Sequence, residues 1–344
     1  MPSTTSHSPE PGRPRLDSAT AAVRLGVRQS LNECSDGAVV LVCVSGGADS
    51  MALAAATVFE AKPRSIRVHS ITVDHGLQRG SDAVAQRTAN ALKRWGIEAH
   101  LERVQVVDAG GPEAAARQAR YRAIDATAQR VGAELVLLGH TLDDQAETVL
   151  LGLARGSGAG SLKAMAPLNG RYARPLLGVR RQQTRDSCAA RGIDVWDDPQ
   201  NDDGSFARVR VRNLVLPVLE EQLGPGIAEA LARTAEQARE DDDAFEQMIE
   251  EFIEEVCEPA EAGIAVEVSA LAHNPAALRN RLIRYVAAAE FGVSLSRTHT
   301  LAIAALVTEW RGQGPIHVPG IVVSRSDGRL VFTAAEKAHS RSGT

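Results

Sequence analysis

A short segment of glycines, hydroxyl groups and one carboxylate carries the clearest chemical signal in this sequence. It reads Ser45-Gly46-Gly47-Ala48-Asp49-Ser50, directly after an apolar run that ends at Val44 and directly before helix-like residues. Free backbone N–H groups at a glycine-rich helix start, with the positive end of the helix dipole, bind polyphosphate, and a neighbouring carboxylate can hold Mg²⁺. The alternative is a plain glycine-rich turn. Spacing excludes two other phosphate fingerprints, because there is no GxxxxGK[ST] and GSGAGS at 156–161 lacks the last glycine of GxGxxG.

A second signal is a concentration of acidic residues in Gly139-His140-Thr141-Leu142-Asp143-Asp144-Gln145-Ala146-Glu147-Thr148. On a helix, Asp143 and Glu147 are four residues apart and Asp144 and Glu147 are three apart, so the carboxylates share one side. Such a patch attracts a cation. The alternative is simple capping of the helix by Asp143, with the other carboxylates in solvent.

The elements that must position these residues follow from the alternation of apolar runs with helix-like segments. Four short, β-branched runs occupy 38–45, 66–73, 100–107 and 134–140. Between them, apolar residues recur at helical spacing, which is typical of an α/β fold with a parallel sheet and helices on both faces. Ligands of such sheets bind at the carboxyl ends of the strands, where both signals lie.

A third segment follows the second run at the same predicted edge. It reads Val73-Asp74-His75-Gly76-Leu77. For His75 alone, an ordinary turn histidine is the alternative.

Turn-forming residues at 198–206, and a helix ended by the glycines and proline at 224–226, indicate a domain boundary. We expect a disordered tail at 1–15, a first domain with all three motifs at 16–222, and a small, mainly helical domain at 223–344. The last of these is predicted to end in a hairpin that turns on Asp327 and Gly328.

The composition is that of a globular protein. The chain has 344 residues, 44% hydrophobic and 24% charged, with a net charge of -5 and four scattered cysteines without a CxxC pair. No run approaches the roughly 18 apolar residues of a membrane span, and the first residues lack the apolar core of a signal peptide. We therefore expect a cytoplasmic protein without disulfides or a membrane partner.

The basic residues favour contact with phosphate. Only 4 of the 38 basic residues are lysines, and the aromatic share is 3%, so nucleic-acid binding would rest on guanidinium groups rather than on ring stacking. Residues 171–212 hold nine arginines against six aspartates. This stretch is our candidate for contact with a nucleic-acid backbone. A helix surface with ordinary ion pairs is the alternative.

The order of the motifs resembles that of the tRNA(Ile)-lysidine synthetase family, a branch of the N-type ATP pyrophosphatases or PP-loop superfamily. SGGxDS is common to that superfamily, which also contains tRNA thiolases and NAD synthetase, whereas GHxxDDQxET is the specific element. The resemblance also includes Glu113-Ala114-Ala115-Ala116-Arg117-Gln118-Ala119-Arg120-Tyr121, Leu153-Ala154-Arg155-Gly156-Ser157-Gly158 and Arg174-Pro175-Leu176-Leu177. It continues to about residue 220 through Asp198, Asn201, Arg208, Arg212, Asn213 and Pro217.

The resemblance implies an adenine nucleotide α-hydrolase-like fold and a reaction in two steps. ATP, with Mg²⁺, would adenylate the 2-carbonyl oxygen of the wobble cytidine in a tRNA-Ile with a CAU anticodon, and pyrophosphate would leave. The ε-amine of L-lysine would then attack carbon 2, and AMP would leave. Adenylation is needed because a carbonyl oxygen is a poor leaving group.

The resemblance also implies roles for the residues at matching positions. The pyrophosphate would be held by Ser45, Gly46, Gly47 and Ser50, and Asp49 would be catalytic and would help bind the metal. Further nucleotide contacts would come from Val73, His75, Gly139 and His140. Asp144 and Glu147 would orient lysine and accept a proton from its ammonium. Arg120 and Arg212 would stabilise phosphate charge or the adenylated base. Lysine or tRNA would also meet Arg117, Arg174 and Arg208.

Two other functions compete with this interpretation. A tRNA thiolase shares the adenylation loop but needs a reactive cysteine, and Cys43 and Cys188 lie in a strand and a helix-like segment, where packing is the expected role. A module that binds ATP or tRNA without catalysis is the alternative of another class. The oligomeric state stays open between monomer and homodimer. Longer members of the family carry a further C-terminal domain, and we expect this chain to end after one small domain.

Overall fold

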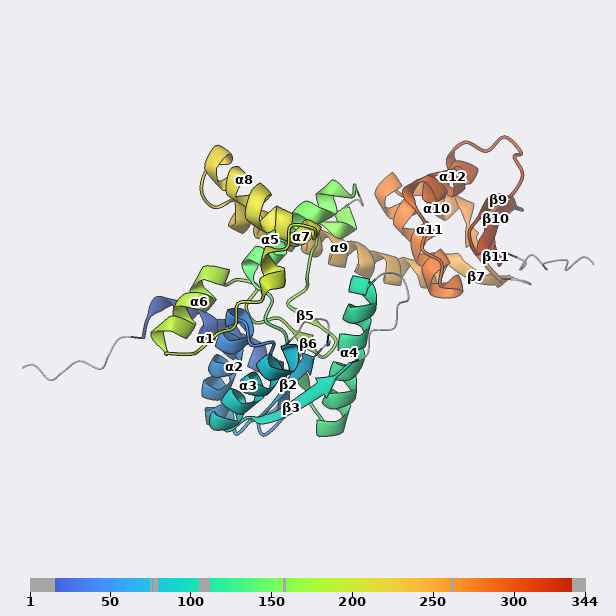
Figure 1. The fold of residues 1–344 in the computed structure, drawn as a ribbon. Helices are drawn as coiled ribbons and strands as arrows, with labels where there is room; N and C mark the ends of the chain where they lie inside the picture. Colours follow the sequence, from blue (N-terminus) through green and yellow to red (C-terminus); the bar gives the residue numbers. More distant parts are fainter. Residues whose placement is uncertain are drawn as a thin grey trace, which may run out of the picture. The chain divides into compact units, whose positions relative to one another are not determined.

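The computed structural model of the chain describes residues 16–335 except 75, 77–79, 105–111, 157–158 and 261–262 (Figure 1). The chain divides into two compact units, one up to Arg239 and one from Glu240. The predicted tail at 1–15 lies outside the described residues. No helix in the described ranges has both the length and the apolar character of a membrane span.

The first unit is built on a six-stranded sheet with the order β3-β2-β1-β4-β6-β5. Its strands are β1 (Val39–Cys43), β2 (Arg67–Asp74), β3 (Glu98–Arg103), β4 (Leu135–Leu137), β5 (Leu168–Asn169) and β6 (Tyr172–Ala173). All neighbouring pairs are parallel except β5 with β6. The four predicted runs thus form the parallel core of the sheet, and the predicted α/β class is confirmed.

Helices cover both faces of this sheet, which explains why its central strands are apolar without alternation. Val40 and Val42 face one side and share a core with α1 (Ser18–Leu31), α2 (Ala48–Ala61) and α3 (Ser81–Arg94). Leu41 faces the other side and packs with Ile124 of α4 (Pro112–Val131). Figure 1 shows α4 apart from the group formed by α1, α2 and α3.

The strand order creates a switch point between β1 and β4. From β1 the chain adds β2 and β3 on one side, and then β4 and β6 on the other. The turn that follows β1 and the turn that follows β4 therefore diverge above the sheet and leave a crevice at the carboxyl ends of the strands. The first turn leads into α2, and the second leads into α5 (Leu142–Ala154). This is where the glycine-rich and acidic motifs were predicted to meet.

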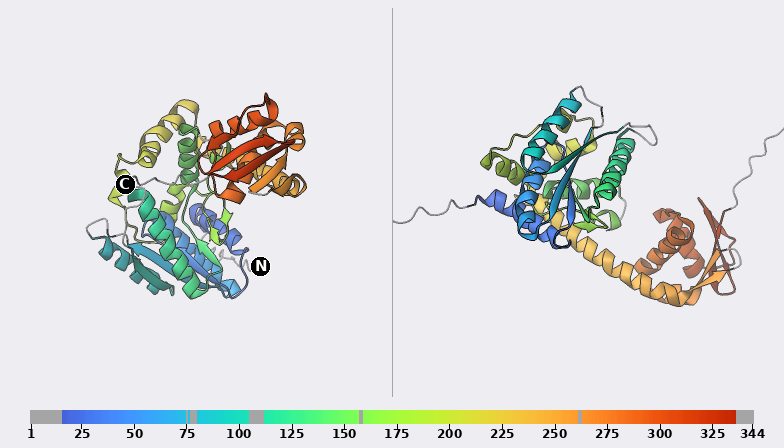
Figure 2. Two further views of the ribbon diagram at one scale, coloured as in Figure 1. Left: turned by 90° about the vertical axis from the view of Figure 1, so that its right-hand side faces the viewer. Right: turned by 90° about the horizontal axis from the view of Figure 1, so that it is seen from below.

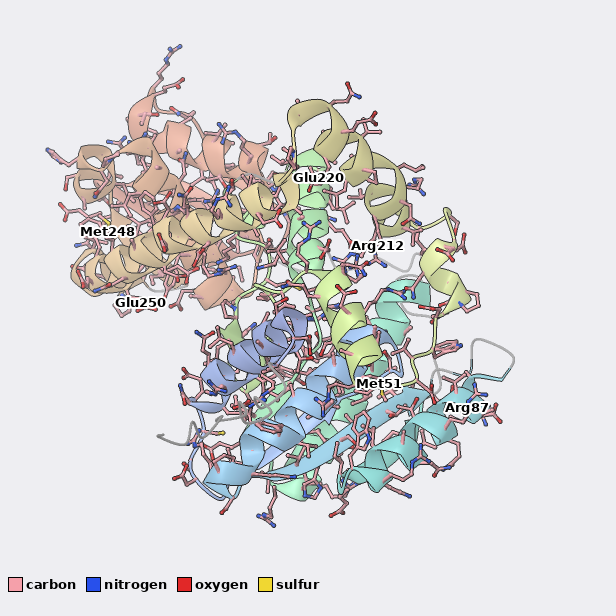
Figure 3. The ribbon with its side chains drawn as sticks, turned by 90° about the vertical axis from the view of Figure 1, so that its left-hand side faces the viewer. Met51, Arg87, Arg212, Glu220, Met248 and Glu250 are labelled. Atoms are coloured by element: carbon pink, nitrogen blue, oxygen red, sulfur yellow. The ribbon has the colours of Figure 1, made fainter. Side chains whose placement is uncertain are left out.

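Two further segments of the first unit complete the surroundings of the crevice. One is α6 (Arg181–Ala190), which packs against α1 and α2. The other runs through α7 (Ala207–Arg210), a π-helical turn (Val211–Val215) and α8 (Leu216–Leu223). Arg212, labelled in Figure 3, projects from the π-helical turn towards α5. Single π-helical turns are frequent at functional sites.

The second unit has the helices and the final hairpin that we predicted, and that hairpin belongs to a five-stranded sheet that we did not predict. Its antiparallel strands follow the order β7-β8-β11-β10-β9 and are coloured orange to red in Figure 2. They are β7 (Cys257–Ala260), β8 (Gly263–Glu267), β9 (Ile316–Val318), β10 (Ile321–Ser326) and β11 (Arg329–Ala334). The helices are α10 (Val268–His273), α11 (Ala276–Phe291) and α12 (Arg297–Thr308). The strands β7 to β9 are too short to show a clear alternation of apolar and polar residues, so the sequence predicted only the last hairpin.

That hairpin is as predicted. Asp327 and Gly328 connect β10 to β11, and both have positive φ, of 49° and 76°. Two left-handed residues in a two-residue loop match the right-handed twist of the flanking strands.

The division between the units lies later than the predicted boundary at 222–223. It falls inside α9 (Ile227–Val256), one continuous helix. Ala228 packs with Leu142 and Leu216 of the first unit, whereas Ile249 belongs to the core of the second unit. Helical periodicity runs unbroken through the division, so the nearest break in the sequence, the glycines and proline before α9, marks only the start of the helix.

Candidate active site

The glycine-rich turn between β1 and α2 has the shape of an anion cradle. Gly46 has a φ of 93°, and a Cβ there would lie 2.7 Å from Thr88 Oγ1. Gly47 caps α2 without a side-chain hydrogen bond, so the positive end of this helix has no side-chain cap. The Ser50 hydroxyl fixes the turn from within, since it accepts from Ser45 N at 3.1 Å and donates to Gly47 O at 2.9 Å.

The end of β4 lies against this turn. A Cβ on Gly139 would be 3.3 Å from both the N and the Cα of Ser50, so a glycine lets the two segments approach closely. The next residue, His140, has a buried Nδ1 without a hydrogen-bond partner among the described residues. Burial lowers the pKa of His140 to about 4, so the ring is neutral at physiological pH. A buried, unsatisfied nitrogen at the crevice suits a ligand that donates or accepts one hydrogen bond.

At the start of α5, Asp144 rather than Asp143 makes the capping contact. Its Oδ2 accepts from Thr141 N at 2.8 Å and from Thr141 Oγ1 at 3.0 Å. Burial disfavours its charge, but Arg181 and the Thr141 N–H together hold the pKa of Asp144 below its usual value. Asp143 turns away and accepts from Arg181 N at 2.7 Å. Asp144 is therefore ionised and fixed in direction.

Glu147 is fully buried beneath arginines. Its side chain is 0% exposed, and Arg212 grips both oxygens, with Nε to Oε1 at 2.7 Å and Nη2 to Oε2 at 3.1 Å. Arg181 Nη2 adds a bond to Oε1 at 3.1 Å, and Arg208 Nε lies 3.7 Å from Oε2. A carboxylate paired in this way fixes the directions of its arginines.

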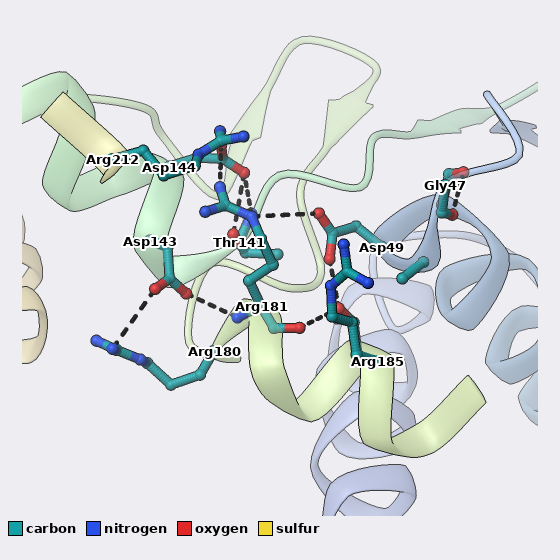
Figure 4. A network of polar contacts seen from close by, with 12 residues as sticks. Gly47, Asp49, Thr141, Asp143, Asp144, Arg180, Arg181, Arg185 and Arg212 are labelled. Carbon is teal, nitrogen blue, oxygen red and sulfur yellow. Dashed lines mark hydrogen bonds and ion pairs between the residues drawn. The ribbon is translucent and has the colours of Figure 1, made fainter. Parts of the chain in front are cut away.

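Arg181, in the first turn of α6, joins the acidic motif to the glycine-rich one. Its Nη2 lies 2.9 Å from Asp144 Oδ1, and its Nε lies 3.8 Å from Asp49 Oδ2 (Figure 4). Despite burial, Asp144 and Glu147 raise the pKa of Arg181 above its ordinary value. Thr184 Oγ1, one turn further along α6, donates a short hydrogen bond to Asp49. Even so, burial raises the pKa of Asp49 to about 6.

The two motifs open onto one cleft of about 650 Å³. Nine of the predicted site residues with described side chains and two of the predicted glycines line it: Ser45, Gly47, Asp49, Ser50, Val73, Arg117, Arg120, Gly139, His140, Asp144 and Arg212. Four other predicted residues lie outside its lining: Gly46, Glu147, Arg174 and Arg208. His75 lies outside the described residues. The shared cleft on which the predicted chemistry depends is therefore present.

The predicted residues outside the lining have contacts within the protein. Arg174 Nη1 donates to Ala166 O at 2.8 Å, and Arg208 Nη2 donates to Thr148 Oγ1 at 2.9 Å. In the lining, Arg117 lies over the ring of Tyr121, at 5.0 Å from its centroid. Desolvation and the nearby Arg117 lower the pKa of Arg120.

Sequence reasoning missed three residues that hold the walls of the cleft in place, two of which, Arg181 and Trp196, line it. Arg181 and Thr184 bind Asp49, and Trp196 N donates to Gly46 O at 2.9 Å and so fixes the loop from the opposite wall. Arg181 lay within the arginine-rich stretch 171–212 that we assigned to a nucleic-acid backbone. In the structure, Arg180 pairs with Asp143 and Glu229, and Arg185 pairs with Asp197. Several arginines of this stretch therefore serve internal ion pairs, as the alternative interpretation held.

The sheet order, the glycine-rich turn at the switch point and the capped cleft define a PP-loop ATP-utilising domain. Residues 21–219 match the PP-loop domain family, and residues 267–331 match the family described as the TilS substrate binding domain. The chain is 57% identical over 298 residues to the tRNA(Ile)-lysidine synthase of Leifsonia xyli subsp. xyli, covering 86% of this chain and 90% of that one. It is 47% identical to the enzyme of the same name from Thermobifida fusca, covering 91% and 97%. The chain belongs to the tRNA(Ile)-lysidine synthase family.

A solved structure shares the fold at much lower identity. The U34-tRNA thiolase NcsA from Methanococcus maripaludis, determined with its [4Fe-4S] cluster, aligns with a TM-score of 0.55 and 18% identity over 64% of this chain and 79% of that one. At this identity the likeness concerns the fold alone.

The buried cluster around Glu147 generates a stability prediction. Glu147→Ala leaves Arg212 and Arg181 without their shared carboxylate, and loss of one partner of a buried ion pair costs about 3–5 kcal/mol. We expect urea unfolding, followed by circular dichroism, to show a loss of at least about 3 kcal/mol in the first unit.

The matched control is Asp186→Ala on α6, an exposed carboxylate that accepts from Gln182 at 2.8 Å. Its loss should change the free energy of unfolding by less than about 0.5 kcal/mol. Equal losses in the two variants would contradict the role given to Glu147.

Proposed function

We propose that this chain ligates the ε-amine of L-lysine to carbon 2 of the wobble cytidine in a tRNA-Ile with a CAU anticodon, by way of an adenylated base. The cytidine 2-carbonyl oxygen attacks the α-phosphorus of ATP, and pyrophosphate leaves. The amine then attacks carbon 2, loses a proton, and AMP leaves with the oxygen. The observation that carries this proposal is the opening of the SGGADS turn and the acidic start of α5 onto one cleft.

The β1–α2 turn fits the phosphates of ATP. Its glycines present backbone rather than side chain, and the start of α2 supplies the positive end of a helix dipole. We assign the pyrophosphate to Ser45, Gly46, Gly47 and Ser50. The unsatisfied Nδ1 of His140 supports a nucleotide contact at the end of β4, and Val73 lies on the same wall. Gly139 acts through close packing on Ser50.

Asp49 fits a site for Mg²⁺. Its carboxylate lies in the cleft directly after the phosphate turn. Burial disfavours its negative charge, and the neighbouring donors offset that effect only in part. Carboxylate and phosphate oxygens are the ligands that Mg²⁺ prefers. When bound, the ion would offset charge on the phosphates of ATP. Thr184 and Arg181 fix the direction of the Asp49 carboxylate within the cleft.

We assign the ammonium of lysine to Asp144, whose carboxylate lines the cleft and stays ionised. Glu147 supports this contact from behind, through Arg181 and Arg212. Arg120 and Arg212 also line the cleft, where a guanidinium can stabilise the phosphate of the adenylated base. The lysine ammonium must lose a proton before its amine can attack, and we assign the acceptance of that proton to Asp144 or Glu147.

The second unit, by the family match over 267–331, is the part that we propose binds the body of the tRNA. Such a substrate points to the cytoplasm as the place of action.

Sulfur transfer finds no carrier among the cysteines. Burial raises the pKa of Cys43 to about 12 and the pKa values of Cys188 and Cys257 to about 11, and it also raises the pKa of Cys34. A thiol must lose its proton to act as a nucleophile. These four thiols are therefore inert at physiological pH, which favours the ligase over the thiolase.

The direct test of the function is mass spectrometry of the wobble base after incubation of the purified chain with tRNA-Ile, ATP, Mg²⁺ and L-lysine. We expect the mass increase of lysine addition, with release of pyrophosphate that depends on the tRNA. Sulfide in place of lysine is the control for a thiolase. An unmodified base, or a mass increase with sulfide alone, would refute the proposal.

The raised pKa of Asp49 gives a pH dependence. Asp49 must lose its proton to bind Mg²⁺, so at limiting Mg²⁺ the rate of pyrophosphate release should fall about tenfold for each pH unit below about 6. Excess Mg²⁺ competes with the proton and should move the midpoint to lower pH. Asp49→Asn should remove this dependence together with most of the activity. A profile that ignores the Mg²⁺ concentration would contradict the assignment.

Asp144 should matter for lysine more than for ATP. Asp144→Asn keeps an oxygen for the Thr141 N–H but removes the charge, and a hydrogen bond to a charged group contributes about 1.5–3 kcal/mol. We expect the KM for lysine to rise at least about tenfold, with adenylation measured without lysine changed much less.

The neighbouring Asp143→Asn is the control, because Asp143 is not among the described residues that line the cleft. It should leave the KM for lysine within about threefold of the wild type. An equal loss of adenylation and amine transfer in Asp144→Asn would remove the basis for this division of roles.

A further inference from the structure

Three side chains with metal-binding atoms meet on the sheet of the first unit, at a distance from the cleft. His69 lies in β2, and Glu98 and His100 lie in the neighbouring strand β3. In the parallel register His69 pairs with Glu98, and His100, two residues further along, faces the same side. No step of the proposed reaction uses them. Among the described residues, no other three histidine, cysteine or acidic side chains converge in this way.

The distances between the possible ligand atoms are close to those of a tetrahedral metal site. His69 Nδ1 and His100 Nε2 are 3.2 Å apart, and the two oxygens of Glu98 lie 3.7 Å from His69 Nδ1 and 3.9 Å from His100 Nε2. A zinc ion about 2.0–2.1 Å from each atom would hold its ligand atoms about 3.3 Å apart. The carboxylate has to move by only about half an ångström.

The two imidazoles are held in place, while the carboxylate is free to adjust. The histidine rings are stacked with their centroids 5.5 Å apart and their planes within 5° of parallel. Their side chains are 13% and 17% exposed, whereas that of Glu98 is 69% exposed. Arg130, whose positive charge acts on His100, donates to Glu102 at 2.7 Å, so a carboxylate already offsets its charge.

We propose that His69, Glu98 and His100 bind one divalent transition-metal ion, of which Zn²⁺ is the best match. Imidazole nitrogens favour zinc, whereas Mg²⁺ and Ca²⁺ prefer oxygen ligands. Three protein ligands leave a fourth position for water. The hydrogen bond between the two rings is exchanged for two metal bonds, so His69 then carries its proton on Nε2 and His100 on Nδ1.

This site is distinct from the proposed Mg²⁺ site. His69 precedes Asp74, which lines the cleft, by five residues of one strand, or roughly 16 Å. The bound ion would tie β3, the outer strand of the sheet, to β2 through side chains as well as through the backbone. Its effect is therefore expected on stability rather than on the ligation reaction.

The test is a zinc titration of the full chain without a histidine tag, in competition with a chromogenic chelator and in excess Mg²⁺. We expect one equivalent of Zn²⁺ to bind and to raise the melting temperature, and Co²⁺ in its place to give the visible absorption of a tetrahedral site. His100→Gln and Glu98→Gln should each weaken zinc binding at least tenfold. His317→Gln, which changes an exposed histidine of β9, should leave binding unchanged.

Glu98→Gln keeps the proposal falsifiable if loss of the His100 ring disturbs the sheet, because Glu98 is largely exposed. Wild-type protein that binds zinc no better than Glu98→Gln would overturn the proposal. Equal binding by wild type and both variants would also overturn it, since the zinc would then lie elsewhere.

Discussion

The candidate site depends on one guanidinium shared by three carboxylates. Arg181 lies within 3.8 Å of Asp49, 2.9 Å of Asp144 and 3.1 Å of Glu147, and these carboxylates belong to two different helix starts. Without a cation between them, like charges at this separation would drive the β1–α2 and β4–α5 turns apart. The strand order creates the cleft, and α6 brings Arg181 to it, where the guanidinium offsets the charge of both turns.

The position of α6 is itself set by packing. Cys188 of α6 belongs to the same core as Val23 and Val27 of α1. Thr20 and Ser187 share a buried hydrogen bond of 2.9 Å, which fixes the relative positions of these two helices. Rigid elements position site residues more precisely than loops do. The packing of α6 on α1 therefore fixes the positions of Arg181 and Thr184.

The sequence predicts the sheet and the place of the site better than it predicts which arginines pair with which carboxylates. Apolar runs long enough to be buried on both faces identify the parallel sheet, and the rule that ligands bind where strands end locates Ser45 and His140. Arg181 could not be separated from the other arginines of 171–212, because the direction of its side chain is decided by tertiary packing. For the same reason, the sequence did not predict that the Glu147 side chain is fully buried, at 0% exposure. Of the second sheet only the β10–β11 hairpin was predicted, because the other strands are short and the pairing of β8 with β11 spans a long separation in the chain.

The three carboxylates are paired to different degrees, and this gradient follows the path from the interior to the cleft. Arg212 binds both oxygens of Glu147, so the Glu147 carboxylate is already neutralised and serves to orient the arginine. Asp144 shares a guanidinium and a helix cap, and remains ionised with one side on the cleft. Burial raises the pKa of Asp49 to about 6, and its partners among the described residues, the Thr184 hydroxyl and an Arg181 nitrogen at 3.8 Å, offset that burial only in part. A carboxylate whose charge is only partly offset gains most from an incoming cation, so the proposed contacts with Mg²⁺ and lysine fall on Asp49 and Asp144, the two carboxylates of the three that line the cleft.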